Sequence, residues 1–269
     1  MGGVTRELAW QACRNARDLG GLPVRGGGET RFGRVVRSDT LRLLTPAGWR
    51  CLVEYGVETV VDLRFPFEVE ADAPLDERPG GLSASVRAAP RANGRPVSLR
   101  TIGISLLGDP DPAVAEDLGR IARAERLPAA STRAVYVEML RRYPDRFAAV
   151  VAAVADAPGS VLVHCHAGKD RTGLVVALLL AVAGVEEEAI AADYALSGPS
   201  LEPSLRPWIE AADDDEDREH RLRVAAAPAA AMLDVLAELD RRYGGAPGYL
   251  LATGLGESRL ARVRERLVA

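Results

Sequence analysis

A short polar loop lies between two apolar segments within "VLVHCHAGKDRTGLVVALLL", at residues 161–180. The first segment is short and β-branched and predicts a buried strand, whereas the longer second segment predicts a buried helix. A strand that leads through a loop into a helix is the repeating unit of α/β folds, whose functional loops follow the carboxyl ends of parallel strands. The sequence therefore predicts a functional loop, and Cys165 lies near its start.

Two further strands and a helix are predicted near the amino terminus. The stretches "RFGRVVRSD" at 31–39 and "VETVVDLR" at 57–64 are rich in β-branched residues, as expected of strands. Between them, Thr45 can cap a helix that has Pro46 at its first position, and Gly56 supplies the left-handed residue that ends it.

The middle of the chain predicts a long connection followed by two helices. Residues 71–112 lose periodicity and collect proline, glycine and arginine, so we expect a surface connection with one strand near 102–107. Apolar residues at helical spacing follow over 131–155, and Pro144 interrupts them. This pattern indicates two consecutive helices.

The order of these segments predicts an α/β fold, a three-layer sandwich with a largely parallel central sheet flanked by helices. A length of 269 residues lies within the range of one domain, and we expect a single domain over 1–269. Residues 200–228 mix helical patches with prolines and an acidic run at 213–217, which we interpret as a solvated turn. The longer segment is our candidate for a mobile helical lid after the helix that follows the loop.

Composition narrows the possible partners and the compartment. The formal net charge is −4, so no overall field favours nucleic acid, and an anion must be bound locally. Three cysteines far apart in sequence do not form a disulfide framework and indicate a reducing compartment. The amino terminus lacks the apolar core of a signal peptide, and the longest apolar run, 174–185, is too short to span a bilayer. We expect a cytoplasmic protein with no membrane span, although export without a signal peptide stays open.

The loop itself combines the groups that bind and attack an oxyanion. Gly168 permits tight curvature, and the amino end of the following helix points free amides at Cys165. That environment lowers a cysteine pKa and favours the nucleophilic thiolate. Arg171 has the planar fork that holds two oxygens of a phosphate through a transition state. Thr172 can donate a hydrogen bond to the sulfur, and the plain alternative is that Cys165 is a buried structural thiol.

Lysine is rare in this chain. Among 34 basic residues the single lysine is Lys169, inside the loop. Its compact, mobile charge suits a second phosphate on the substrate, because Arg171 already supplies the bidentate clamp. The alternative is that Lys169 mainly lowers the pKa of the cysteine.

At this point the residues resemble a known family, the cysteine-dependent phosphatases, whose signature His-Cys-x5-Arg-Ser/Thr is matched by "HCHAGKDRT". With "NARDLGG", "RSDTL", "VVDLR", "DYALS" and "YGGAPGYL", the chain is similar to the atypical bacterial tyrosine and lipid phosphatases of the mycobacterial protein tyrosine phosphatase B type. The resemblance implies a phosphotyrosine protein phosphatase-like fold with a lid. It also implies that Cys165 is the nucleophile, that Arg171 binds phosphate, and that Lys169 and Asp170 are a pair typical of lipid phosphatases. The backbone amides of the loop, at His166, Ala167, Gly168, Lys169 and Thr172, are expected to bind the substrate.

The general acid stays open at this stage, because no Trp-Pro-Asp loop is present. Asp170 either caps the following helix or protonates the leaving oxygen. Asp111, or its neighbour Asp109, occupies a position that resembles the family's movable acidic loop, and a Pro-Asp-Pro surface turn is the alternative.

The other polar residues near the motif are expected to support the loop. His164 is expected to orient the loop through a hydrogen bond, because a metal held by His164 and His166 would lack further ligands at suitable spacing. Ion pairs of three arginines with nearby aspartates are expected behind the site; the residues are Arg17, Arg37 and Arg64 with Asp18, Asp39 and Asp62.

The sequence therefore predicts a phosphoester hydrolase that works through a cysteinyl-phosphate, with no cofactor and no metal. Its expected partners are phosphorylated proteins or phosphoinositides, and the oligomeric state is left open. Two alternatives stand beside it: a rhodanese-like sulfurtransferase, and a phosphoinositide-binding pseudophosphatase without activity.

Overall fold

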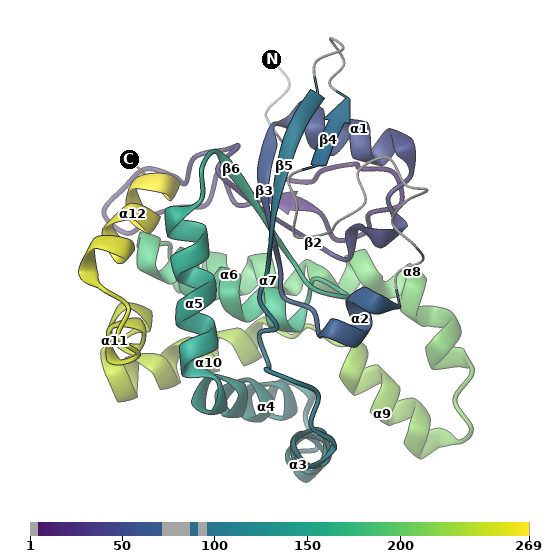
Figure 1. Ribbon diagram of the computed structural model, residues 1–269. Helices are drawn as coiled ribbons and strands as arrows, with labels where there is room; N and C mark the ends of the chain where they lie inside the picture. Colours follow the sequence, from purple (N-terminus) through teal and green to yellow (C-terminus); the bar gives the residue numbers. More distant parts are fainter. Residues whose placement is uncertain (1–4, 72–86, 91–95, 269) are drawn as a thin grey trace.

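A six-stranded, mostly parallel sheet organises the protein in the computed structural model, which describes residues 5–71, 87–90 and 96–268 (Figure 1). The strand order is β1-β2-β6-β3-β5-β4. The strands are β1 (Arg17–Asp18), β2 (Val35–Ser38), β3 (Val57–Asp62), β4 (Arg87–Pro90), β5 (Pro96–Gly103) and β6 (Ser160–His164). The pairs β2/β6, β6/β3 and β3/β5 are parallel. The outermost strands are antiparallel to their neighbours: β1 pairs with β2, and β4 pairs with β5. The predicted largely parallel sheet is confirmed.

The central strands end at one level. His164 is paired with Ser38 of β2 on one side and with Asp62 of β3 on the other. The loop that follows β6 therefore emerges between the loops that follow β2 and β3. This is the edge at which parallel α/β sheets place their functional groups.

Helix α1 (Pro46–Tyr55) covers one face of the sheet, where Trp49 and Leu52 pack in a buried cluster with side chains of β2, β3 and β6. Its ends are as predicted. The Thr45 side chain accepts a hydrogen bond from the Gly48 amide at 3.2 Å, and Gly56 has a φ of 94°.

A larger helical layer covers the opposite face. It consists of α4 (Pro128–Arg142), α5 (Pro144–Asp156), α6 (Asp170–Ala183), α7 (Glu187–Ala195), α10 (Ala229–Tyr243), α11 (Ala246–Ala252) and α12 (Glu257–Leu267). Helix α6 is apolar on all sides and runs through the middle of this layer, in the larger of the two buried clusters. Pro144 separates α4 from α5, as predicted from its missing amide donor.

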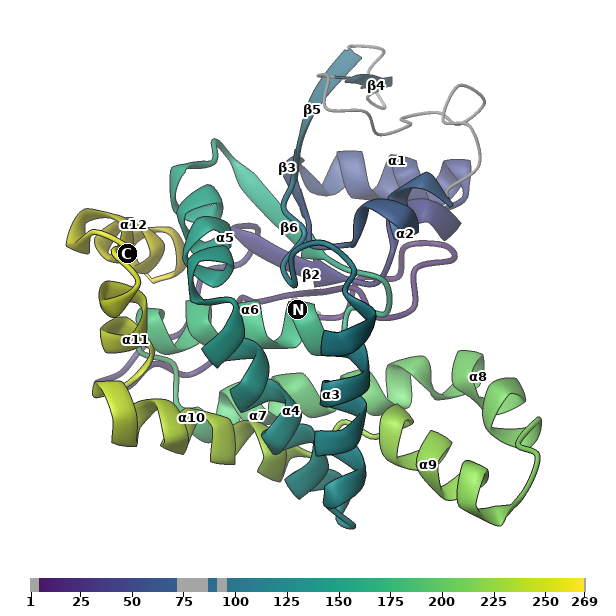
Figure 2. The ribbon, with the colours of Figure 1, turned by 60° about the horizontal axis from the view of Figure 1, so that its bottom comes forward.

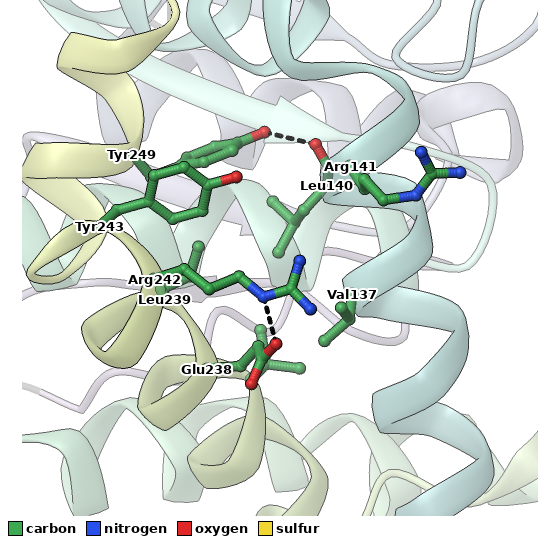
Figure 3. Close-up of a pocket in the computed structure, with 9 residues that line it drawn as sticks. Val137, Leu140, Arg141, Glu238, Leu239, Arg242, Tyr243 and Tyr249 are labelled. Atoms are coloured by element: carbon green, nitrogen blue, oxygen red, sulfur yellow. Dashed lines mark hydrogen bonds and ion pairs between the residues drawn. The ribbon is translucent and has the colours of Figure 1, made fainter.

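The junction between α4, α10 and α11 encloses a hollow of only about 20 Å³ (Figure 3). The Tyr249 hydroxyl donates to the Leu140 carbonyl at 2.8 Å above it, and Glu238 pairs with Arg242 below it. A volume of this size holds about one water molecule, so this hollow is a packing defect and no substrate site.

Two pieces project toward the carboxyl edge of the sheet. The short α2 (Pro66–Glu70) follows β3, and α3 (Pro112–Ala124) packs against α4. Helices α8 (Ser197–Glu210) and α9 (Asp215–Ala225) form a hairpin, here called the arm, that extends away from the sheet (Figures 1 and 2).

Three expectations for irregular segments need correction or lie outside the described residues. The expected strand at 102–107 is β5, which begins earlier and ends at Gly103, and the connection 71–112 holds a second strand, β4. Much of that connection, 72–86 and 91–95, is outside the described residues. The acidic run at 213–217 is solvent-exposed but is more than a turn, because Asp214 caps α9 and the next three residues form its first turn, where the helix dipole favours carboxylates.

Among the described helices, none combines the length and the apolar character that a membrane crossing requires.

Candidate active site

The loop between β6 and α6 turns sharply at Gly168. Its φ is 66°, and a Cβ at this position would lie 2.3 Å from the Ser38 carbonyl oxygen. A side chain here would therefore collide with the backbone of the neighbouring strand end. The curvature predicted from the sequence is thus imposed by close contact with β2.

Three successive carbonyls of the loop are held from behind. The Thr40 amide donates to the His166 carbonyl at 2.9 Å, the Asn15 side-chain amide donates to Ala167 at 3.0 Å, and Arg37 donates to Gly168 at 2.7 Å. Because the carbonyl and the amide of one peptide unit point in opposite directions, carbonyls that face backward turn the following amides forward. An array of amides at a helix amino terminus suits an oxyanion.

Cys165 lies at the base of this array and is 3% exposed. The residue before it, His164, is fully buried and donates from Nδ1 to the Cys165 carbonyl at 3.0 Å. Burial lowers the pKa of His164 and outweighs the opposing charge of Asp62, whose Oδ2 lies 3.7 Å from Nε2. A neutral His164 therefore holds the carbonyl of Cys165, and its role in orienting the loop stays a prediction.

Arg171, in the first turn of α6, does not point freely into solvent. Its two terminal nitrogens donate to the two carboxylate oxygens of Glu68 at 2.5 and 2.8 Å. The guanidinium carbon lies 5.1 Å from the centre of the Phe65 ring, within range of a cation–π contact. Glu68 lies in α2, and Phe65 is the residue that precedes this helix. The α2 segment therefore fixes the side chain of Arg171, the candidate for phosphate binding.

Thr172 does not make the predicted contact. Within the part of the chain that the structure describes, its buried hydroxyl oxygen has no hydrogen-bond partner, the sulfur of Cys165 included. His166 is the most solvent-exposed of the histidines at the loop, and its Nδ1 lies 3.9 Å from Glu68.

Asp170 is the first residue of α6, and the N-cap position of that helix is Lys169. Oδ1 of Asp170 accepts a hydrogen bond from the Tyr136 hydroxyl at 2.6 Å, and the Tyr194 hydroxyl lies 2.9 Å from that of Tyr136. Lys169 Nζ is 3.5 Å from the same carboxylate oxygen. The capping alternative for Asp170 is therefore wrong.

Asp111 begins a helix and does not lie in the isolated surface turn of the alternative, and its role as the acid stays a prediction. It is the N-cap of α3, and its carboxylate accepts from the Ala113 and Val114 amides at 2.9 and 3.4 Å. With Asp109 it lines a hollow beside Phe67, next to the cavity described below. The structure thus brings Asp170 to the loop and leaves Asp111 on a neighbouring wall.

Lys169 is buried and joins the loop to the arm. Its ammonium donates to the Val224 carbonyl and, at 3.1 Å, to the Ala226 carbonyl at the end of α9. The only lysine of the chain therefore lies under the root of the arm.

A cavity of about 400 Å³ opens in front of the loop. One wall is apolar and comes from α3, α4 and the segments before them; it includes Phe65, Leu107, Leu118, Val135 and Met139. The loop contributes Lys169, Asp170 and Arg171, and the arm contributes His220, Arg223 and Val224. The cavity is thus apolar on one side and largely cationic on the other.

A buried ion network supports the loop from below. Asp193 of α7 accepts hydrogen bonds from Arg17 at 3.0 Å and from Arg37 at 2.7 Å, and Arg6 also pairs with it. Burial would raise the pKa of Asp193, but these arginines hold it well below its ordinary value. The expected pairs of Arg17 with Asp18 and of Arg37 with Asp39 are therefore wrong, whereas the pair of Arg64 with Asp62 is present at 2.8 Å.

Sequence reasoning missed Glu68, Phe65 and Tyr136, which contact the loop from distant elements, and Asp193, which holds Arg37 behind it. The one available signal for Asp193 was its position in "DYALS". Over the described ranges, His, Cys, Asp and Glu residues form no group of three or more that could hold a metal ion.

The geometry of the loop and the comparisons with known proteins indicate the same class of protein. The fold is an α/β sheet in which a buried cysteine follows the central strand β6 and precedes a tight turn into α6. The sequence model of the tyrosine phosphatase family matches residues 8–269. A tyrosine-protein phosphatase of Nostoc commune is 37% identical over 143 residues, which are 49% of this chain and 47% of that protein. The triple specificity protein phosphatase PtpB of Mycobacterium tuberculosis is 31% identical over 255 residues, 87% of this chain and 90% of that protein.

The chain therefore belongs to the tyrosine phosphatase family and is a PtpB-like bacterial member of it.

Proposed function

We propose that the protein hydrolyses phosphate monoesters, phosphotyrosine first among them, through a covalent intermediate on Cys165. The observation that carries this proposal is the loop geometry: three carbonyls face backward onto Thr40, Asn15 and Arg37, so the amides that follow them point to the opposite side of the loop. Such an array stabilises negative charge both on a thiolate and on a transferring phosphoryl group. Membership of the family supports the same chemistry.

In the proposed reaction, the Cys165 thiolate attacks phosphorus, and the Sγ–P bond forms as the bond to the ester oxygen breaks. Asp170, in its protonated form, gives its proton to the departing oxygen. Water then attacks the cysteinyl-phosphate while Asp170 takes a proton from the water. The Sγ–P bond breaks, inorganic phosphate leaves and the thiolate is restored. We favour Asp170 over Asp111 as the acid because Asp170 lines the cavity beside Arg171, whereas Asp111 caps a helix.

The cavity supports an aromatic phosphoester as the preferred substrate. Phe65, Val135 and Met139 offer an apolar surface to a phenyl ring, next to the phosphate-binding edge of the loop. The arm adds Arg223 and His220, which suit an additional anionic group. We extend the proposal to phosphoserine, phosphothreonine and phosphoinositide substrates, and the PtpB relative, described as a triple specificity phosphatase, supports that breadth.

We also propose that residues 200–228, which include most of the arm, form a lid. Its root is held by Lys169 of the loop, and its α9 contributes to one wall of the cavity. Closure over the loop would exclude water from the thiolate. Hydrogen exchange in α8 and α9 should slow when an oxyanion binds, and exchange that is equally fast with and without the oxyanion would contradict a lid.

Turnover of p-nitrophenyl phosphate in the presence of a chelator tests the proposed chemistry. The wild type should be active, Cys165→Ser should be inactive, and Cys51→Ser, on the exposed side of α1, should match the wild type. Acid-quenched enzyme should carry phosphate on Cys165. Activity only with thiosulfate and cyanide would favour a sulfurtransferase, and binding of phosphoinositides without turnover would favour a pseudophosphatase.

A further inference from the structure

Two buried tyrosines form a hydrogen-bonded chain that ends on Asp170, the candidate acid. Tyr136 of α4 is 2% exposed and Tyr194 of α7 is 0% exposed, and their rings meet edge to face with centres 5.9 Å apart. The Tyr136 hydroxyl donates to Oδ1 of Asp170 at 2.6 Å and lies 2.9 Å from the Tyr194 hydroxyl. The pair either satisfies two buried hydroxyls and nothing more, or supports the acid.

The hydrogen bonds of this chain run in one direction. A phenol has one hydrogen to donate. Tyr136 gives its hydrogen to Asp170, so the bond between the two hydroxyls has Tyr194 as its donor. Burial, together with the nearby Asp170 carboxylate, raises the pKa of both tyrosines above the ordinary value of 10.0. Both phenols therefore keep their hydrogens at neutral pH, and donation runs from Tyr194 to Tyr136 to Asp170.

This direction decides which oxygen of Asp170 can carry a proton. Oδ1 accepts from Tyr136, and the Lys169 ammonium lies 3.5 Å from the same oxygen. Among the described residues, Oδ2 has no hydrogen-bond partner, and the Asp170 side chain is 43% exposed where it lines the cavity. A proton on Oδ1 would meet two donors, so a protonated Asp170 carries its proton on Oδ2.

The tyrosine pair is packed tightly against the helix that Asp170 begins. A Cβ at Gly173, in the first turn of α6, would lie 3.0 Å from Cδ2 of Tyr194, closer than side chains normally pack. The absence of a side chain at Gly173 therefore gives the Tyr194 ring its place. Rotation of the Asp170 carboxylate would leave the buried Tyr136 hydrogen without an acceptor, which costs free energy. The chain thus resists reorientation of the carboxylate.

We propose that Tyr136, held by Tyr194, is a positioning residue that fixes the Asp170 carboxylate so that Oδ2 carries the proton given to the leaving oxygen. This inference rests on the proposed function, in which Asp170 is the acid. The proton passes from Oδ2 to the ester oxygen as the P–O bond breaks, and Oδ2 takes a proton from water when the cysteinyl-phosphate is hydrolysed. The tyrosines keep their own hydrogens throughout, so Tyr136 acts through Asp170.

The test compares Tyr136→Phe and Tyr194→Phe with Tyr249→Phe as the matched control. Tyr249→Phe also removes a buried tyrosine hydroxyl, the one that donates to the Leu140 carbonyl (Figure 3). For each protein, kcat and KM are measured on phenyl phosphate and on p-nitrophenyl phosphate, because the poorer leaving group depends more on the acid. Tyr136→Phe and Tyr194→Phe are each also combined with Asp170→Asn in a double-mutant cycle.

Tyr136→Phe should lower kcat on phenyl phosphate by about tenfold, with a smaller change in KM and a smaller loss on p-nitrophenyl phosphate. In the Asp170→Asn background the same substitution should have almost no further effect, because Tyr136 acts through that carboxylate. Tyr194→Phe keeps the bond from Tyr136 to Asp170 and should show a smaller loss of the same kind. Tyr249→Phe should match the wild type in kcat.

Equal losses on the two esters, or a loss that persists in the Asp170→Asn background, would show a structural role and overturn the inference. A Tyr136→Phe protein that matches Tyr249→Phe would also overturn it. Thermal unfolding verifies that each variant is folded, and the same outcomes for Tyr194→Phe decide the question if Tyr136→Phe is not. A wild type with neither turnover nor phosphate trapped on Cys165 would refute the proposed function itself, a result that is distinct from an active wild type with a silent Tyr136→Phe.

Discussion

The back and the front of the loop at 164–172 are held by charged side chains in different ways. At the back, Asp193 is fully enclosed and is shared by several arginines, one of which also holds the loop carbonyl of Gly168. At the front, Arg171 has one carboxylate partner, and Lys169 holds two carbonyls of the arm. A buried group with many partners is costly to disturb, whereas single partners beside a cavity can be exchanged. The back is therefore expected to set the shape of the loop, and the front to respond to substrate.

The largest expected effect is the loss of Asp193. Asp193→Asn leaves two buried arginines without their counter-charge, and removal of one partner of a buried ion pair costs about 3–5 kcal/mol. Urea unfolding should show this loss in the free energy of unfolding, with Asp234→Asn, an exposed aspartate on α10, as control. A loss below about 1 kcal/mol would mean that the back of the loop is no more rigid than the front.

At the front, Asp170→Asn should leave stability almost unchanged and lower kcat on phenyl phosphate by about a hundredfold to ten-thousandfold, the range for a general acid. The loss should be smaller on p-nitrophenyl phosphate, because its leaving group needs less protonation. Asp111→Asn is the matched comparison and should have little effect on kcat. If Asp111→Asn shows the larger loss with the poorer leaving group, Asp111 is the acid.

Lys169→Met should separate substrate classes. Its ammonium now donates to two carbonyls of the arm and lies 3.5 Å from the Asp170 carboxylate, and an additional phosphate of a phosphoinositide is a further charged partner for it. We expect kcat/KM on multiply phosphorylated lipids to fall by about one to two powers of ten, with a much smaller loss on phosphotyrosine peptides. Equal losses, together with an upward shift of the pH profile, would indicate instead that Lys169 acts on the pKa of Cys165.

The smallest expected effect is the change in the stability contribution of Asp193 at acidic pH. The pKa of Asp193 in the folded protein lies below its ordinary value of 3.8, so its contribution to stability is present above that value and is lost as the pH falls toward the folded pKa. Urea unfolding at several pH values should show a constant gap between wild type and Asp193→Asn at pH 5–7. Below about pH 4 the gap should narrow by about 1.4 kcal/mol per pH unit. A gap that does not change in acid would contradict the assignment.

Local signals in the sequence were sufficient for the elements that frame the site. Thr45 acts through a side-chain bond to a nearby amide, and Gly56 and Pro144 act through their own backbone geometry, so their effects follow from neighbouring residues alone. Strand β5 was misplaced because "PVSLRTIG" begins with proline and lacks a clear alternation of apolar and polar residues.

The ion pairs behind the loop could not be derived in this way. Arg17 and Asp18 are consecutive in β1, and consecutive strand residues point to opposite faces of the sheet. Asp39 is occupied by the Cys13 thiol and by amides of the preceding loop. The actual partner, Asp193, follows Arg37 by 156 positions, a distance over which only the packed fold determines contact.

Lys169 is the single lysine side chain at which this protein can be chemically labelled, and its burial controls access to that position. Because no other lysine exists in the chain, the ε-amine of Lys169 and the α-amine are the only targets for amine-reactive reagents. The ε-amine is covered by the end of α9, so its acylation requires that the root of the arm separate from the loop. An endoproteinase specific for lysine likewise has one cleavage position in this sequence, inside the loop that holds Cys165, and the rate at which it cuts the native chain measures how often that position is uncovered.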